Sequence, residues 1–287
     1  MIGKCIAPLA ALLLSAGSAH AAPAMWKVSD EDSAIWLFGS VHLLPSWTEW
    51  RTEALDKVIS KVDRVYFETD ISVEAQMGIA DLSYELGFSQ DGRLLSEKIG
   101  PDLTNALRER AEEVALPMPL LLTMEPWMAA TTISVGAVAG IGYEPTHGVE
   151  AVLNAELPAD RRGFLETPEE QLGFLAYGDL DEQIAMLKAT LDSMDTMSAD
   201  IRTMVDAWIA GEPELLGEIF NGQMGTDATG MVERLIDERN HNWVDQIAAM
   251  LENNETALLV VGAAHLAGDV SVVKLLEERG FTSERVQ

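Results

Sequence analysis

The amino-acid sequence predicts a mixed α/β (α+β) protein with a central, mostly parallel sheet and a large helical insertion. Four short apolar runs have the length of buried strands, and helix-like stretches separate them along the chain. Two of these runs, 34–38 and 257–261, end in the same pattern, Gly-x-x-His. The two patterns can meet only if the strands that precede them are neighbours in one sheet.

The first 21 residues have the composition of a secretory signal peptide. Lys4 supplies a positive charge, Cys5–Leu14 is apolar, and Ala19–Ala21 is a small-x-small cleavage pattern. The apolar run is shorter than the roughly 20 residues that span a bilayer. We therefore expect cleavage after Ala21 and a periplasmic or secreted protein with no stable membrane span.

The composition limits the classes of protein that fit. A formal net charge of −28 argues against binding to nucleic acid, which depends on Lys and Arg neutralising phosphates. The single cysteine, Cys5, lies in the expected signal peptide, so disulfides, thiolate metal ligands and a cysteine nucleophile are excluded from the mature chain. Residues 22–287 are long enough for one domain with its own core.

A β-α-β unit is expected over residues 34–70. The run 34–38 is its first strand, and Thr48 is placed to cap a helix in which apolar residues recur at helical spacing. Arg64–Phe67 is the second strand and ends in Glu68. Because a crossover helix makes its two strands parallel, the first Gly-x-x-His and Glu68 belong at the same end of the sheet.

Helices are expected to fill the insertion, roughly 71–161 and 168–251. Pro101 begins a helix that extends to Val114, and the run 127–143 is uncharged. Thr, Ser and Gly residues keep the hydrophobicity of that run modest, so we expect a helix buried in protein rather than a membrane span. Further helices are expected at 168–193, 198–210, 213–221 and 229–251.

Two more strands and a closing helix complete the prediction. The strand 163–165 ends in Glu166, after which Thr167 can cap a helix that has Pro168 in its first turn. The strand Ala257–Val261 leads to the second Gly-x-x-His, and the helix Asp269–Arg279 ends at Gly280.

Each predicted strand thus ends in a residue that can bind a metal ion or transfer a proton: His42, Glu68, Glu166 and His265. Imidazole and carboxylate together suit Mn²⁺, Co²⁺, Zn²⁺ or Fe²⁺, whereas carboxylates alone would favour Mg²⁺ or Ca²⁺. Each residue by itself also has a structural explanation, because it can cap a helix or bond to a loop carbonyl. Their convergence at four strand ends favours a functional site.

Six segments of the chain carry a resemblance to a known family. They are Gly39–His42, Glu68–Asp70, Glu125–Met128, Tyr143–Glu150, Leu165–Leu172 and Gly262–His265. In this order they resemble the TraB/GumN family over nearly all of the mature chain. The resemblance implies a ChaN/erythromycin esterase-like fold, in a wider group that includes haem-binding ChaN and the Tiki proteins, described as metal-dependent proteases of Wnt ligands.

The resemblance also implies roles for particular residues. His42, Glu68 and His265 match the residues proposed to form the active site, with Glu68 serving as a ligand or as a catalytic acid/base. Glu166 and Arg239 fall on further positions typical of the family. At Gly148–Glu150 the chain departs from the common Gly-x-Asp pattern, so the resemblance assigns no fixed role to position 150.

Arg239 has more than one interpretation. Its guanidinium can anchor a carboxylate or phosphate of the substrate, or orient Glu68 or Glu166. It can equally form an ordinary ion pair on the surface of an acidic helix. His147 and His241 do not follow a predicted strand and are not expected to bind metal.

Two functions from different classes fit these observations. The first is an exported, metal-dependent hydrolase in which metal-activated water attacks an amide or ester bond of a peptide or small molecule. The second is an exported binding protein without catalytic activity, for haem, a metal ion or a small ligand, or an accessory factor in surface polysaccharide assembly.

Overall fold

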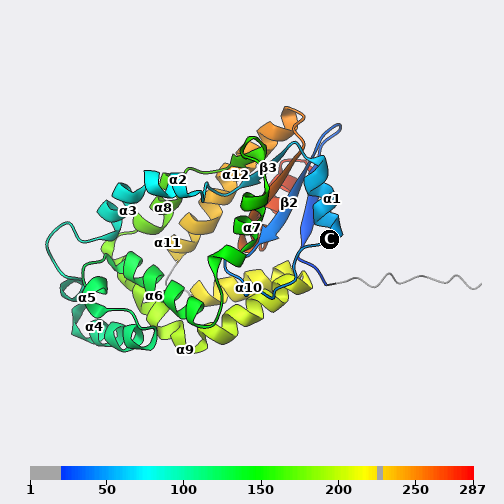
Figure 1. Cartoon of the computed structure of the whole chain (residues 1–287). Coiled ribbons are helices and arrows are strands. Elements are labelled where there is room, and N and C mark those ends of the chain that lie inside the picture. The colour runs from blue at the N-terminus through cyan, green and yellow to red at the C-terminus, as the bar shows by residue number, and fades with distance from the viewer. Residues whose placement is uncertain (1–20, 225–228) are drawn as a thin grey trace, which may run out of the picture.

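The computed structural model describes residues 21–224 and 229–287 and confirms the mixed α/β class. One six-stranded, mostly parallel sheet lies at one end of the molecule, and most of the helices form a lobe beside it (Figure 1). The expected signal peptide lies outside the described residues, except for Ala21.

The sheet has the strand order β4-β3-β5-β2-β1-β6. β2, β5, β3 and β4 run parallel to one another, whereas β1 is antiparallel to both β2 and β6. All four predicted strands are present, with small differences at their ends. The strands are β1 Met25–Ser29, β2 Ala34–Ser40, β3 Arg64–Phe67, β4 Arg162–Phe164, β5 Ala257–Gly262 and β6 Thr282–Arg285.

The two strands that end in Gly-x-x-His are neighbours. β2 and β5 pair in parallel, from Ile35 opposite Ala257 to Ser40 opposite Gly262. β5 is almost entirely buried, as is typical of parallel strands covered on both faces, and this explains its unbroken apolar sequence. Segments from the two ends of the chain therefore lie side by side at the centre of the sheet.

β1 and β6 were not predicted from the sequence. β6 has the polar sequence Thr-Ser-Glu-Arg and is mostly exposed, so no apolar pattern marks it. β1 is only partly buried and lies between β2 and β6. Backbone pairing at the edge of the sheet, rather than the burial of side chains, makes these segments strands.

The helices fall into two groups. Those interleaved with the strands are α1 Glu53–Lys61, α7 Val149–Glu156, α12 Glu238–Glu252 and α13 Val272–Glu278. The others are α2 Val73–Gly78, α3 Ala80–Gly87, α4 Leu95–Glu113, α5 Met118–Leu121, α6 Pro126–Gly140, α8 Pro168–Ala176, α9 Leu180–Ala210, α10 Pro213–Met224 and α11 Thr229–Val232. A π-helical turn, Glu233–Asp237, joins α11 to α12.

Several predicted helix boundaries were wrong, because local hydrogen bonds place the starts elsewhere. Thr52, not Thr48, caps α1 by accepting a hydrogen bond from the amide of Leu55. The amide of Thr48 instead donates to the carbonyl of Pro45 in a turn before the helix. α4 begins at Leu95 and bends at Gly100, which has a φ of 77°. The last helix begins after Ser271, whose side chain caps it, rather than at Asp269.

The predicted division between helices 168–193 and 198–210 was also wrong. α8 ends at Ala176, and Asp179 caps the start of α9 by accepting a bond from the amide of Glu182. α9 then continues unbroken to Ala210, because the residues of the expected break also pack: Met194 and Met197 are both partly buried against core clusters.

α6 occupies most of the uncharged run 127–143 and is buried in protein, as predicted. Trp127, Ala130 and Ile133 are buried, and the helix packs along α9. No helix in the described parts of the chain is long and apolar enough to cross a membrane.

Candidate functional site

The carboxyl ends of the four parallel strands place the predicted residues along one edge of the sheet. His42 follows β2, Glu68 follows β3, Glu166 follows β4, and His265 lies in a short 3₁₀ turn after β5. In open α/β sheets this edge is where ligands bind. Glu68, Glu166 and His265 share one hydrogen-bonded network, and His42 lies beside it.

Arg239, on α12, is the centre of that network. Its Nη2 donates to Oε2 of Glu68 at 2.6 Å, and its Nε and Nη2 donate to the two oxygens of Glu166 at 2.7 and 2.9 Å. All three side chains are buried. The interpretation of Arg239 as a surface ion pair was therefore wrong, and the guanidinium instead fixes the positions of both carboxylates.

Glu68 is held as a carboxylate. The amide of Gly262 donates to its Oε1 at 2.7 Å, and Gln171 donates to its Oε2 at 3.2 Å. Burial opposes ionisation of this group, but the positive charges of His42 and Arg239 and the bond from the amide of Gly262 outweigh burial and lower the pKa of Glu68. At neutral pH, Glu68 is therefore negatively charged.

His265 is neutral, and its tautomer follows from its partners. Burial lowers the pKa of His265 to about 3. Nη1 of Arg239 lies 3.2 Å from Nε2 of His265, and because a guanidinium only donates, Nε2 is the acceptor. The hydrogen is therefore on Nδ1, which donates to Oδ1 of Asn240 at 2.7 Å. Asn240 is itself fixed by a bond to the carbonyl of Val270.

His42 is anchored on a different carboxylate. Its Nδ1 lies 2.9 Å from Oε1 of Glu150, which also accepts a hydrogen bond from the hydroxyl of Ser40. The charge of Glu150 raises the pKa of His42 above its ordinary value. The His42 side chain is 56% exposed, so its ring is open to a ligand while Nδ1 is fixed.

Gly262 marks the point toward which three of these side chains converge. A Cβ atom added to Gly262 would lie 3.1 Å from Oε1 of Glu68, 3.5 Å from Cδ2 of His265 and 3.6 Å from Nε2 of His42. Nε2 of His265 is in turn 4.0 Å from Oε1 of Glu68. Glycine at this position leaves the space between the two imidazoles and the carboxylate open.

The chemistry of this donor set fits a divalent transition metal. Each histidine is bonded through Nδ1 to a protein oxygen, and such partners orient the Nε2 atoms of metal-binding histidines. As they stand, no three His, Cys, Asp or Glu side chains among the described residues enclose one metal position. Binding at Nε2 of His265 would replace its bond from Arg239 Nη1, which also donates to the carbonyl of Leu235 at 3.1 Å and would keep that partner.

The polar residues form the floor of a cavity of about 380 Å³. His42, Glu68, Arg239, Gly262 and His265 all line it, together with apolar side chains from surrounding helices. Glu166 does not line the cavity and lies behind Arg239. Glu166 therefore contacts Arg239, which lines the cavity, rather than the cavity itself.

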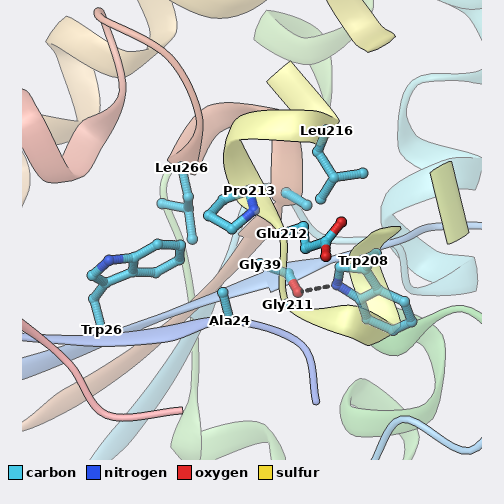
Figure 2. A pocket seen from close by; sticks show the side chains of 10 residues that line it. Ala24, Trp26, Gly39, Trp208, Gly211, Glu212, Pro213, Leu216 and Leu266 are labelled. Atoms are coloured by element: carbon cyan, nitrogen blue, oxygen red, sulfur yellow. Dashed lines mark hydrogen bonds between the residues drawn. The ribbon is translucent and has the colours of Figure 1, made fainter. Parts of the chain in front are cut away.

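A tryptophan supports the glycine of the first Gly-x-x-His pattern. Nε1 of Trp208, on α9, donates to the carbonyl of Gly39 at 2.8 Å (Figure 2). The space around Gly39, Pro213 and Leu266 has a volume of about 10 Å³. That volume is at the lower limit for one water molecule, so this space is too small to be a ligand site. The bond from Trp208 instead stabilises the end of β2.

Sequence reasoning missed Glu150, Asn240, Gln171 and the polar contact of Trp243, which donates to Oε1 of Glu166 at 2.8 Å. One signal was available for Glu150. A Cβ atom at Gly148 would overlap the carbonyl oxygen of His42, so the glycine of Gly148–Glu150 is what lets this segment pass so close to the site. His147 and His241 do not line the cavity.

The protein is thus a mixed α/β protein in which two histidines, two carboxylates and a buried arginine lie together at the carboxyl ends of the parallel strands. A model of the TraB/PrgY/gumN family matches residues 24–285, and the chain belongs to this family. It is also similar to an uncharacterized protein of Treponema pallidum (strain Nichols), with 19% identity over 280 residues that cover 91% of this chain and 82% of the relative. No solved structure matches the chain.

Proposed function

We propose that this protein is a metal-dependent hydrolase that cleaves an amide or ester bond in the cavity lined by His42, Glu68 and His265. One observation supports this most strongly. Two imidazoles from opposite ends of the chain are each fixed through Nδ1, and both lie beside the same ionised carboxylate. Proteins orient metal-binding histidines by bonds of this kind.

His42, Glu68 and His265 would hold the ion, and their nitrogen and oxygen donors suit Mn²⁺, Co²⁺, Zn²⁺ or Fe²⁺. When bound, such an ion would act as a Lewis acid and lower the pKa of a water molecule. Glu68 Oε1 faces the same space and retains one lone pair beside its bond from Gly262, which would either bind the ion or accept a proton from the water molecule.

Arg239 and Glu166 are positioning residues in this proposal. Arg239 holds Oε2 of Glu68, which leaves Oε1 directed toward the two histidines. Glu166 pairs with Nε and Nη2 of Arg239 and fixes the orientation of the guanidinium plane. Burial of all three groups keeps water out of this network, which strengthens its hydrogen bonds.

We further propose that the hydrolase works in the periplasm or outside the cell. The support is in the sequence: a positively charged start, an apolar run and a small-x-small pattern ending at Ala21. A peptide or a small molecule in that compartment would then be the substrate.

The experiment compares two double variants of the purified mature chain. After incubation with Mn²⁺, Co²⁺, Zn²⁺ or Fe²⁺ and desalting, bound metal is measured by mass spectrometry and hydrolysis with a library of fluorogenic peptides and esters. We expect about one ion per chain, as for a single-metal site, and cleavage that depends on the ion. His42→Ala with His265→Ala removes both, whereas His147→Ala with His241→Ala, outside the cavity, removes neither.

Full metal content in the His42/His265 double variant would show that the ion binds elsewhere. Bound metal without hydrolysis of any substrate in the library would instead favour an exported binding protein that uses the same cavity.

A further inference from the structure

We propose that the substrate presents an uncharged aliphatic group next to the bond that is cleaved, and that the walls of the cavity bind this group. The aliphatic side chain of a peptide and the aliphatic acyl chain of an ester share this chemistry. The inference rests on the proposed hydrolase function and adds the class of substrate.

The first support is the contrast between the floor of the cavity and its walls. Most of the polar side chains follow the carboxyl ends of the strands and Arg239 reaches them from α12, whereas the other surrounding helices contribute apolar ones. Apolar side chains on the walls include Val138 from α6, Ile201 and Met204 from α9, Leu216 from α10, and Leu235 and Ile236 from the π-helical turn. Small-molecule sites have this composition, with mostly apolar walls and a few placed polar groups.

The second support is that the charges of the floor are paired within the protein. Arg239 is the one Lys or Arg side chain among the described residues that line the cavity, and it is bonded to both Glu68 and Glu166. His42 is paired with Glu150. The metal ion of the proposed function would be occupied by the bond that is cleaved. A carboxylate or phosphate on the group beside that bond would therefore lose its water without gaining a free cation from the side chains, which is unfavourable.

The third support is that the π-helical turn belongs to the apolar wall and also contacts Arg239 in the floor. The π-helical turn Glu233–Asp237 presents Leu235 and Ile236 to the cavity, and the carbonyl of Leu235 accepts a bond from Arg239. π-helical turns are rare and are often found at functional sites. The same short segment thus lines the apolar wall and holds the group that positions Glu68. A ligand on the wall lies next to the reacting groups.

The volume limits the size of the bound group. About 380 Å³ lies in the lower part of the range of roughly 300–1,000 Å³ that is typical of small-molecule sites. A few aliphatic carbons beside the reacting bond fit such a space, whereas a long folded segment does not.

The test measures binding of a neutral apolar probe, N-phenyl-1-naphthylamine, to the mature chain by fluorescence. N-acetyl-leucine amide and methyl hexanoate are the competitors that represent the peptide and acyl sources, and N-acetyl-glutamate amide is the charged control. We expect at least one aliphatic competitor to displace the probe, and the one that does so identifies the source. The charged control should leave the probe bound.

Two matched variants locate the binding. Met204→Glu places a charge in the wall and should weaken probe binding by about tenfold or more, because a buried charge without a partner is unfavourable. Met77→Glu makes the same change at an exposed position on α2 and should have no effect. Met204→Gln, which adds polarity without charge, gives an intermediate loss, and circular dichroism and thermal unfolding show that each variant is folded.

Equal probe binding by folded Met204→Glu and Met77→Glu would overturn the inference, as would displacement by the glutamate amide as strong as by the leucine amide. These outcomes are separate from a failure of the proposed function. Aliphatic ligands that bind in the cavity but are never cleaved would contradict the hydrolase and leave the cavity chemistry intact. Metal-dependent cleavage without preference for aliphatic groups would contradict this inference alone.

Discussion

Nη2 of Arg239 lies 2.6 Å from Oε2 of Glu68, although the two residues are 171 positions apart in the sequence. The same guanidinium bonds to Glu166 and to Nε2 of His265, so one side chain from α12 joins residues that follow β3, β4 and β5. The edge of the sheet brings these residues near one another. Arg239 determines how they are oriented.

Replacing Arg239 should destabilise the fold as well as the site. Arg239→Ala leaves two buried carboxylates without their cation, and removing one partner of a buried ion pair lowers the free energy of unfolding by about 3–5 kcal/mol. Urea unfolding measures this loss. Arg234→Ala, which removes a more exposed pair with Glu182, should lower stability by less than about 1 kcal/mol. Similar losses in the two variants would show that the Arg239 network is not the structural centre described here.

Glu150→Gln should weaken metal binding without unfolding the protein. The amide can still contact Nδ1 of His42 but carries no charge, and loss of such an outer partner typically lowers metal affinity by roughly 10–100-fold. Titration calorimetry with Mn²⁺ or Zn²⁺ measures the change. The matched variant is Glu144→Gln beside His147, which should bind metal like the parent chain. Unchanged affinity in Glu150→Gln would mean that His42 does not depend on this carboxylate.

Gly262→Ala should disturb the site through a single methyl group. The new Cβ would lie 3.1 Å from Oε1 of Glu68, so this carboxylate must shift slightly, and it would fill the space 3.6 Å from Nε2 of His42. The φ of Gly262 is −50°, which alanine adopts without strain, so stability should change little. We expect metal affinity and hydrolysis to fall together. Gly78→Ala, where a Cβ meets nothing within 4 Å, is the control. Parental activity in Gly262→Ala would contradict the convergence of these side chains.

Trp208→Phe tests the support behind the first Gly-x-x-His. The substitution keeps an aromatic ring but removes the donor to the carbonyl of Gly39, and a buried carbonyl without its partner lowers stability by about 1–3 kcal/mol. Chemical denaturation measures the loss. Trp47→Phe, at a position that is 72% exposed, should change stability by less than about 0.5 kcal/mol. If both variants are equally stable, Trp208 does not brace this strand end.

The strand ends could be predicted from the sequence because local patterns define them. An unbroken apolar run followed by Gly-x-x-His indicates a buried strand and its turn, and the crossover rule then gives the relative direction of β2 and β3. The position of β5 between these two strands could not be obtained in this way. It depends on which long-range pairing buries more surface, and no local pattern contains that information.

The partners of the site residues could not be predicted for a related reason. Glu150 and Asn240 are ordinary polar residues on helices, and they gain a role only because α7 and α12 pack against the strand ends. Arg239 lies in a charged segment that resembles a solvated helix surface, yet it is 6% exposed. The burial of such a residue follows from tertiary packing rather than from its neighbours in the sequence.

We propose above that His42, Glu68 and His265 bind one metal ion between them. Crystals of the mature chain soaked in Mn²⁺ or Zn²⁺, with anomalous diffraction recorded at the metal edge, test it most directly. We expect one strong anomalous peak beside Gly262, within about 2.0–2.3 Å of Nε2 of both histidines and of a carboxylate oxygen of Glu68. A fully occupied peak at another place, with the bond between Arg239 and His265 intact, would contradict it.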